Sequence, residues 1–133
     1  MTFRQFALPL AGLIAVGADV FGQENFGRSD GPDDPQIVFN NACRTCHTLR
    51  EGDNRLGPNL HNIIGRRAGS LPNYGYSSAM KGVDVVWDKT TLDRFIANPD
   101  QVVSGNKMKP FGGLASAEDR AKIIAFLEAN AGS

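Results

Sequence analysis

Cys43-Arg44-Thr45-Cys46-His47 is the only stretch of this 133-residue chain that contains cysteine. Two cysteines three positions apart, followed directly by histidine, are typical of the site at which a c-type haem is attached through two thioethers. Residues three and four apart share one face of a helix, so a single turn can present both thiols and the imidazole to one flat ligand. The motif therefore predicts a covalent haem at the centre of the core, with His47 on the iron.

A redox disulfide and half of a zinc site are the alternative interpretations of the same two cysteines. A thioredoxin-like site needs a strand–helix–strand setting, and a structural zinc site needs further ligands. The chain has no third cysteine, its only other histidine is His61, and strand-like alternating runs are scarce. These features favour the haem interpretation over both alternatives.

The first 22 residues predict a secretory signal peptide. Arg4 precedes an apolar run from Phe6 to Ala18, and the segment ends in the small residue Gly22, so we expect cleavage before Gln23. The run is too short to span a bilayer, and an uncleaved anchor is the alternative. Export agrees with the cysteine motif, because bacteria attach haem to reduced thiols outside the cytoplasm. Together the two features predict a periplasmic protein.

The rest of the chain predicts one small domain with a short extension in front of it. Residues 23–33 are polar, contain glycine and show no periodicity, so we expect a flexible extension there. Residues 34–133 are enough for one domain with a modest core. The whole chain carries 14 basic and 14 acidic side chains, and this balance gives no indication of nucleic-acid binding.

Helix signals predict an all-α fold with three main helices, at the start, middle and end of the domain, and shorter helices and loops between them. Most of the expected helices begin at a capping side chain or a proline and end near glycine, asparagine or proline. Glycines and Pro110 exclude long regular structure between positions 102 and 113. The expected helices run from Pro35 through the cysteine motif, from Asn59 to Ile64, from Ser77 to Lys81, from Asp88 to Asn98 and from Ser116 to about Ala129.

Three side chains could supply the sixth iron ligand, opposite His47. His61 follows His47 by only fourteen residues, so a surface position is the simpler interpretation. Met80 falls in a short expected helix, where a methionine usually fills the core. Met108 lies on a long loop behind the preceding helices, and such a loop can close over the opposite face of the haem. We therefore favour Met108.

Hydrogen-bond donors between positions 66 and 87 could bind the two haem propionates. Buried carboxylates without partners are costly, so donors are expected around them. The aromatic members of the group could also simply fill the core. The carbonyl of Pro58 could accept the ring N–H of His47, although a Gly-Pro pair alone indicates no more than a turn. The donors are Arg66, Arg67, Tyr74, Tyr76 and Trp87.

Taken in order, these motifs resemble those of the class I cytochromes c, most closely the bacterial cytochrome c2 type, which is close to mitochondrial cytochrome c. The resemblance covers about residues 35–129. One methionine alone would be a weak signal, but all of the motifs in family order are a strong one. They are Cys43-Arg44-Thr45-Cys46-His47, Gly57-Pro58-Asn59-Leu60, Gly65-Arg66-Arg67-Ala68-Gly69, Tyr74-Gly75-Tyr76-Ser77, Trp87, Asn98-Pro99, Lys107-Met108 and Arg120 to Leu127.

The resemblance implies a set of site residues and an activity. It implies one covalent haem c on Cys43 and Cys46, with His47 and Met108 as axial ligands. It also implies a soluble periplasmic one-electron carrier, not an enzyme. Around the haem it places the Pro58 carbonyl on His47, and Arg66, Tyr76, Ser77 and Trp87 at the propionates.

The resemblance also implies partners. The expected donor is a quinol-oxidising cytochrome bc1-type complex, and the expected acceptor is a terminal oxidase or a photosynthetic reaction centre. A monomer would contact these membrane complexes transiently. The alternatives are a haem enzyme or gas sensor with an open sixth site, and a haem domain permanently docked in a larger redox complex.

Several positions depart from the family pattern. Phe95 replaces a frequent tyrosine and Met80 a common asparagine, and both changes remove polarity near the haem, so we expect an altered reduction potential. Pro35 occupies a position at which the family usually has glycine, where the terminal helices cross. Ala42 and Asp100 stand where lysine is common around the haem edge, so we expect weaker electrostatic steering of acidic partners.

Overall fold

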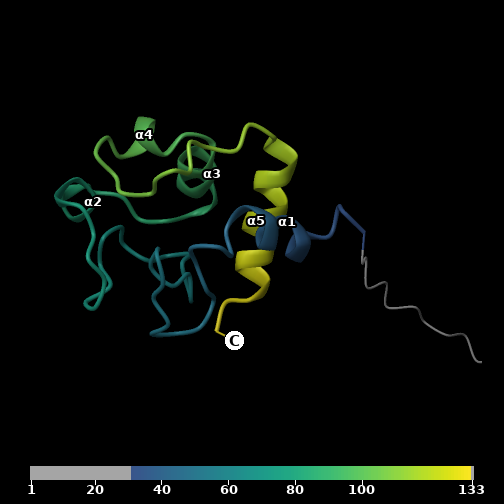
Figure 1. Ribbon diagram of the computed structural model, residues 1–133, viewed down its shortest axis with the longest axis horizontal. Helices are drawn as coiled ribbons and strands as arrows, with labels where there is room; N and C mark the ends of the chain where they lie inside the picture. Colours follow the sequence, from purple (N-terminus) through teal and green to yellow (C-terminus); the bar gives the residue numbers. More distant parts are fainter. Residues whose placement is uncertain (1–30, 133) are drawn as a thin grey trace, which may run out of the picture.

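The computed structural model describes residues 31–132, and the regular structure in this range is helical (Figure 1). The only β-type pairing there is an isolated bridge between Arg67 and Val86, so the predicted all-α fold is confirmed. No helix in the described range is long and apolar enough to cross a membrane. The predicted signal peptide and most of the predicted extension lie outside the described residues. The helices are α1 (Pro35–Ala42), α2 (Ser78–Gly82), α3 (Lys89–Ala97), α4 (Pro99–Val102) and α5 (Ala117–Ala129).

The two terminal helices pack against each other, and their contact closes the fold (Figure 1). Phe39 of α1 is only 3% exposed and Ile123 of α5 is fully buried. The rings of Phe39 and Phe126 lie with their centroids 4.9 Å apart. Pro35 fits the first turn of α1, where its missing N–H would have no partner inside the helix. The crossing therefore forms with proline at the position where the family usually has glycine.

Three of the predicted helices begin where their capping side chains indicated. The Ser77 hydroxyl accepts from the backbone N–H of Met80 at the start of α2. Asp88 and Thr91 form a reciprocal capping box at the start of α3. The Ser116 hydroxyl accepts from the backbone N–H of Asp119 at the start of α5. Each bond satisfies an amide that the helix itself leaves without a partner.

One prediction about a short helix was wrong, and one short helix was not predicted. Residues 59–64 form turns and no helix, because Asn62 adopts a left-handed backbone with φ of 49° and the carbonyl of Asn59 accepts from the side chain of Arg66 instead of from a helical N–H. The helix α4 was not predicted. It begins directly behind α3, because Asn98 accepts from the backbone N–H of Gln101 and Pro99 occupies the first helical position.

Replacing Arg120 with alanine should lower the free energy of unfolding by about 2 kcal/mol. Its side chain, 13% exposed, donates to Asp93 at 2.7 Å and to the backbone carbonyls of Leu114 and Ala115 at 2.9 Å each. The substitution leaves these acceptors without their donor. Denaturant titration of the haem-loaded protein measures the change.

Lys89→Ala is the matched control for this prediction. Lys89 forms an ion pair with Glu128 at 2.9 Å, but its side chain is 67% exposed. An exposed pair of this kind contributes about 0 to 1 kcal/mol. Equal losses in the two variants would contradict a special role for Arg120 in joining α3, α5 and the loop between them.

Candidate functional site

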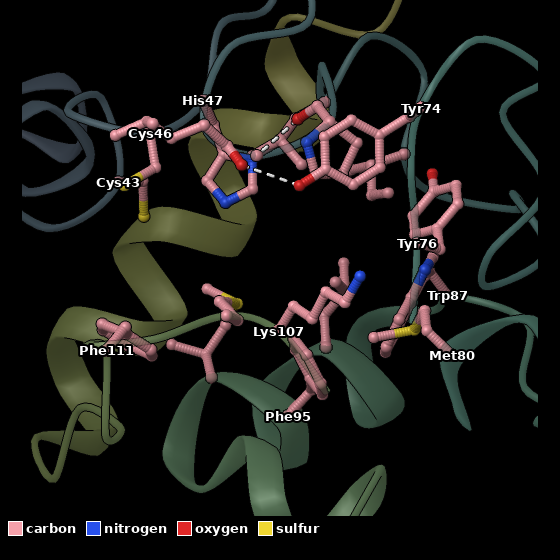
Figure 2. A pocket seen from close by; sticks show the side chains of 18 of the residues that line it. Cys43, Cys46, His47, Tyr74, Tyr76, Met80, Trp87, Phe95, Lys107 and Phe111 are labelled. Carbon is pink, nitrogen blue, oxygen red and sulfur yellow. Dashed lines mark hydrogen bonds between the residues drawn. The ribbon is translucent and has the colours of Figure 1, made fainter. Parts of the chain in front are cut away.

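A cavity of about 410 Å³ lies inside the helical shell. In Figure 2, Cys43, Cys46 and His47 face it from one side, Phe95, Lys107 and Phe111 from the opposite side, and Tyr74, Tyr76, Met80 and Trp87 from a third. Side chains of α3 and α5 complete the lining, which is mostly apolar. All nine site residues that the family resemblance implies line this one cavity: Cys43, Cys46, His47, Pro58, Arg66, Tyr76, Ser77, Trp87 and Met108.

The cysteine motif lies in a hydrogen-bonded turn directly behind α1. We expected it on the helix itself, but α1 ends at Ala42. The carbonyl of Cys43 still accepts from the backbone N–H of Cys46 at 3.1 Å and of His47 at 3.0 Å. Helix-like spacing is thereby kept for one more turn, and both sulfurs and the imidazole reach the same cavity. Both thiols are free, and burial, followed by the nearby Cys46, raises the pKa of Cys43 to about 11.

His47 is buried and its orientation is set by one hydrogen bond. Its Nδ1 lies 2.7 Å from the carbonyl oxygen of Pro58, and because a carbonyl can only accept, Nδ1 carries the proton. Burial lowers the pKa of His47, and the bond to Pro58 partly opposes this effect. The neutral ring therefore presents the lone pair of Nε2 to the cavity, which is the form that binds a metal.

Gly57 forms a cradle for the imidazole of His47, and the sequence analysis missed this role. A Cβ atom at position 57 would lie 2.7 Å from Nδ1 and 2.9 Å from Nε2 of His47. The backbone N–H of Gly57 donates to the carbonyl of Cys46 at 2.8 Å. The His47 ring therefore lies against the backbone of Gly57, in the space that a side chain would otherwise occupy. The Gly57-Pro58 pair was visible in the sequence, but nothing local to it indicates a ring from ten positions earlier.

Five predicted propionate donors line the cavity, and a sixth, Arg67, does not. One of the five, Tyr74, donates its hydroxyl to the carbonyl of Leu56 at 2.7 Å. Arg66 donates to the carbonyls of Asn59, at 2.7 Å, and of His61. Burial raises the pKa of Tyr76, and the neighbouring Arg66 opposes the rise. Arg67 points away instead, pairs with Asp84 on the surface and is excluded from the site. Ser77 and Trp87 are both buried where they line the cavity.

The structure distinguishes the three candidates for the sixth iron ligand by whether they line the cavity. His61 does not line the cavity; it belongs to a second, polar cavity and its Nε2 lies 3.0 Å from the side-chain nitrogen of Asn62. Met80 and Met108 both line the site. The backbone N–H of Met108 donates to the side chain of Asn106 at 2.9 Å, so the loop that carries Met108 is anchored.

The cavity fits a haem c by the chemistry of its lining. Two free thiols stand beside an imidazole with an available lone pair, and two thioethers lie in the same apolar space. The polar groups of Arg66, Tyr76 and Ser77 provide donors for carboxylates. A flat apolar cofactor with two acidic groups requires this combination.

Comparisons with known proteins agree with this fit. A family model described as cytochrome C oxidase, cbb3-type, subunit III matches residues 30–127. A cytochrome c2 of Rhodomicrobium vannielii is 39% identical over 119 residues, which cover 86% of this chain and 91% of the relative. A cytochrome c of Stellaria longipes is 42% identical over 92 residues, which cover 68% of this chain and 84% of the relative. The chain therefore belongs to the class I c-type cytochromes, and is an electron-transfer protein with one covalently bound haem c and not an enzyme.

Proposed function

We propose that this chain is a periplasmic one-electron carrier in which Cys43 and Cys46 hold the haem covalently and His47 and Met108 bind its iron. The observation that carries the proposal is the free Nε2 of His47, which faces a cavity that Met108 also lines. The bound haem supplies an iron that cycles between ferrous and ferric states. Two protein ligands that stay in place in both states keep rearrangement small when an electron moves.

The chain's own residues set the conditions for this chemistry. The apolar lining from α3 and α5 disfavours the extra positive charge of ferric iron, and a thioether ligand favours the ferrous state. Pro58 fixes the ring of His47 through its carbonyl. Arg66, Tyr76, Ser77 and Trp87 line the cavity, and we expect them to bind the propionates, which would keep two carboxylates from being buried without partners.

The proposed donor is a quinol-oxidising cytochrome bc1-type complex, and the proposed acceptor is a terminal oxidase or a photosynthetic reaction centre. The similarity to a bacterial cytochrome c2 over 86% of the chain supports this assignment. Periplasmic export rests on the predicted signal peptide of residues 1–22. A monomer that meets each membrane complex transiently can serve both in turn.

One set of spectra tests the ligation. Haem that stays on the polypeptide in a denaturing gel establishes covalent attachment, and a ferric charge-transfer band from methionine sulfur establishes the sixth ligand. Rapid binding of carbon monoxide by the reduced protein at neutral pH would instead indicate an open sixth site. Reduction of the purified protein by a quinol-oxidising complex tests the donor directly.

Electron transfer to an acidic partner should depend only weakly on ionic strength. Lys107 and Lys109 are exposed beside the cavity, but Lys109 is paired with Asp100 at 2.6 Å. This pair removes most of the long-range attraction that an isolated lysine would supply. Stopped-flow rates over a range of salt concentrations measure the dependence, and a steep fall in rate with salt would contradict it. In Asp100→Asn, which frees Lys109, the dependence should become steeper.

Phe95→Tyr should change the reduction potential. Phe95 lines the cavity, is 7% exposed and packs against Trp87 with ring centroids 4.9 Å apart. A hydroxyl added there brings a dipole into an apolar lining, and this dipole changes the relative stability of ferric and ferrous iron. Redox titration measures the shift, and an unchanged potential would show that polarity at this position does not reach the iron.

A further inference from the structure

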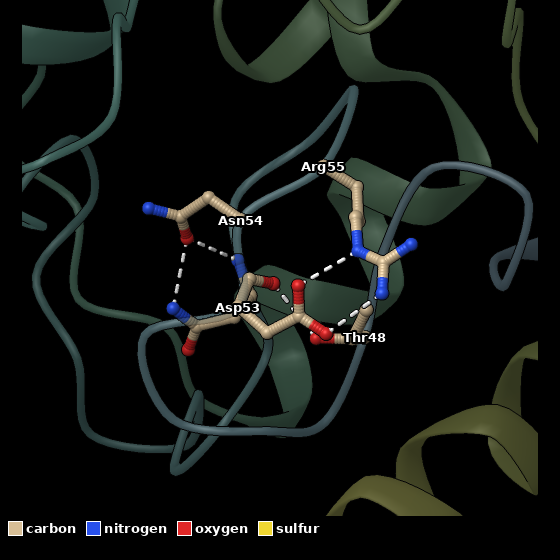
Figure 3. A network of polar contacts seen from close by, with 5 residues as sticks. Thr48, Asp53, Asn54 and Arg55 are labelled. Carbon is tan, nitrogen blue, oxygen red and sulfur yellow. Dashed lines mark hydrogen bonds and ion pairs between the residues drawn. The ribbon is translucent and has the colours of Figure 1, made fainter.

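Asn54 binds two other segments of the chain through its side-chain amide, and Figure 3 shows the bonds that its oxygen accepts. Its Oδ1 accepts from the backbone N–H of Asn59 at 2.9 Å and from the Asn59 side chain at 2.8 Å. Its Nδ2 donates to the carbonyl of Asn73 at 3.3 Å. Asn59 is 3% exposed, so the bond to its backbone N–H satisfies a donor that water does not reach freely.

The N–H that Asn54 binds belongs to the same peptide group as the carbonyl of Pro58. That carbonyl accepts from Nδ1 of His47 at 2.7 Å. One peptide plane therefore connects the Asn54 side chain to the His47 ring, with a hydrogen bond at each end. Hydrogen bonds at the two ends of an amide strengthen each other, because each polarises the group further.

We propose that Asn54 is a positioning residue that sets how strongly His47 donates electrons to the haem iron. The inference rests on the proposed function, in which His47 is an iron ligand. A more polarised Pro58 carbonyl draws the Nδ1 proton more strongly and makes the ring a better electron donor. Stronger donation favours ferric iron, so Asn54 lowers the reduction potential. Gly57 lies so close to the same ring that a Cβ there would overlap it, which leaves the Pro58–Asn59 peptide as the adjustable contact.

Asn54→Leu and Thr48→Val separate this effect from ordinary loop stability. Leucine branches at the same carbon as asparagine but carries no hydrogen-bonding group, so it removes the acceptor of the Asn59 N–H. Thr48→Val removes another hydrogen bond of the same loop, the one from the Thr48 hydroxyl to the carbonyl of Asp53 at 2.8 Å (Figure 3). The control bond does not involve the Pro58–Asn59 peptide. Both variants should lower the free energy of unfolding, but only Asn54→Leu should change how strongly His47 donates electrons to the iron.

The experiment measures the proton resonance of His47 Nδ1–H in the ferrous haem-loaded protein and the reduction potential. In Asn54→Leu the resonance should move upfield and the potential should rise, relative to the parent and to Thr48→Val. In Asn54→Asp a carboxylate oxygen replaces the acceptor, so the resonance should move downfield. Resonances that stay at the parent value in both Asn54 variants overturn the proposal, as does an equal shift in Thr48→Val.

The same spectra distinguish failure of this inference from failure of the proposed function. If His47 is not an iron ligand, the parent itself lacks a ring resonance shifted by the haem. If the parent shows that resonance and the Asn54 variants leave it unmoved, only the role of Asn54 is wrong. Should Asn54→Leu fail to retain haem, the direction of the shift in Asn54→Asp decides, because that variant keeps an acceptor for the Asn59 N–H.

Discussion

Met108→Ala should abolish the ferric charge-transfer band of methionine sulfur and lower the reduction potential by on the order of 0.1 V or more. Alanine offers no atom that can bind iron, and a thioether ligand favours the ferrous state, so its loss favours the ferric one. The backbone around position 108 is anchored by Asn106, which bonds to Asp100 and to the carbonyl of Val103 as well. Optical spectra and redox titration measure both effects.

Met80→Ala is the matched control for Met108→Ala. Met80 is the second thioether in the cavity, and it is buried at 9% exposure. Its truncation should cost about 2 kcal/mol of unfolding free energy through lost packing, but it should leave the charge-transfer band in place. A band that survives in Met108→Ala and disappears in Met80→Ala would assign the sixth position to Met80.

The features that were predicted from sequence are those that a few neighbouring residues determine. Cys43, Cys46 and His47 act together within one turn, and capping by Ser77, Asp88 and Ser116 is complete within three residues of each helix start. Local chemistry of this kind can be recognised in sequence without knowledge of the fold. The resemblance to class I cytochromes c then supplied the order of the elements.

The features that were not predicted depend on contacts between distant residues. The helix expected over 59–64 is absent because Arg66 binds the carbonyl of Asn59 and Asn62 adopts a left-handed backbone. The role of Gly57 depends on where the ring of His47 lies. Neither partner is visible from the spacing of residues near position 57 or 59, so tertiary contacts override the local signals there.

Gly57→Ala should lower the free energy of unfolding by about 3 kcal/mol and disturb the binding of His47 to iron. The added Cβ would overlap Cε1 of His47 and lie 2.7 Å from Nδ1, closer than side-chain carbons approach such atoms. The loop has little freedom to move away, because Gly57 donates to Cys46 at 2.8 Å and accepts from Arg55 at 2.9 Å. The ring must therefore shift, and its 2.7 Å bond to Pro58 must weaken.

Gly75→Ala isolates this steric effect from the general effect of replacing glycine. Neither Gly57 nor Gly75 has a left-handed backbone, and a Cβ at position 75 would meet nothing within 4 Å. Alanine at such an open site restricts the unfolded chain and stabilises the protein by about 0.4 to 1 kcal/mol. Both substitutions replace glycine with alanine, but in denaturant titrations Gly57→Ala should lower the free energy of unfolding and Gly75→Ala should raise it. Equal stabilities would show that the cradle yields, and that His47 is held by Pro58 and the iron alone.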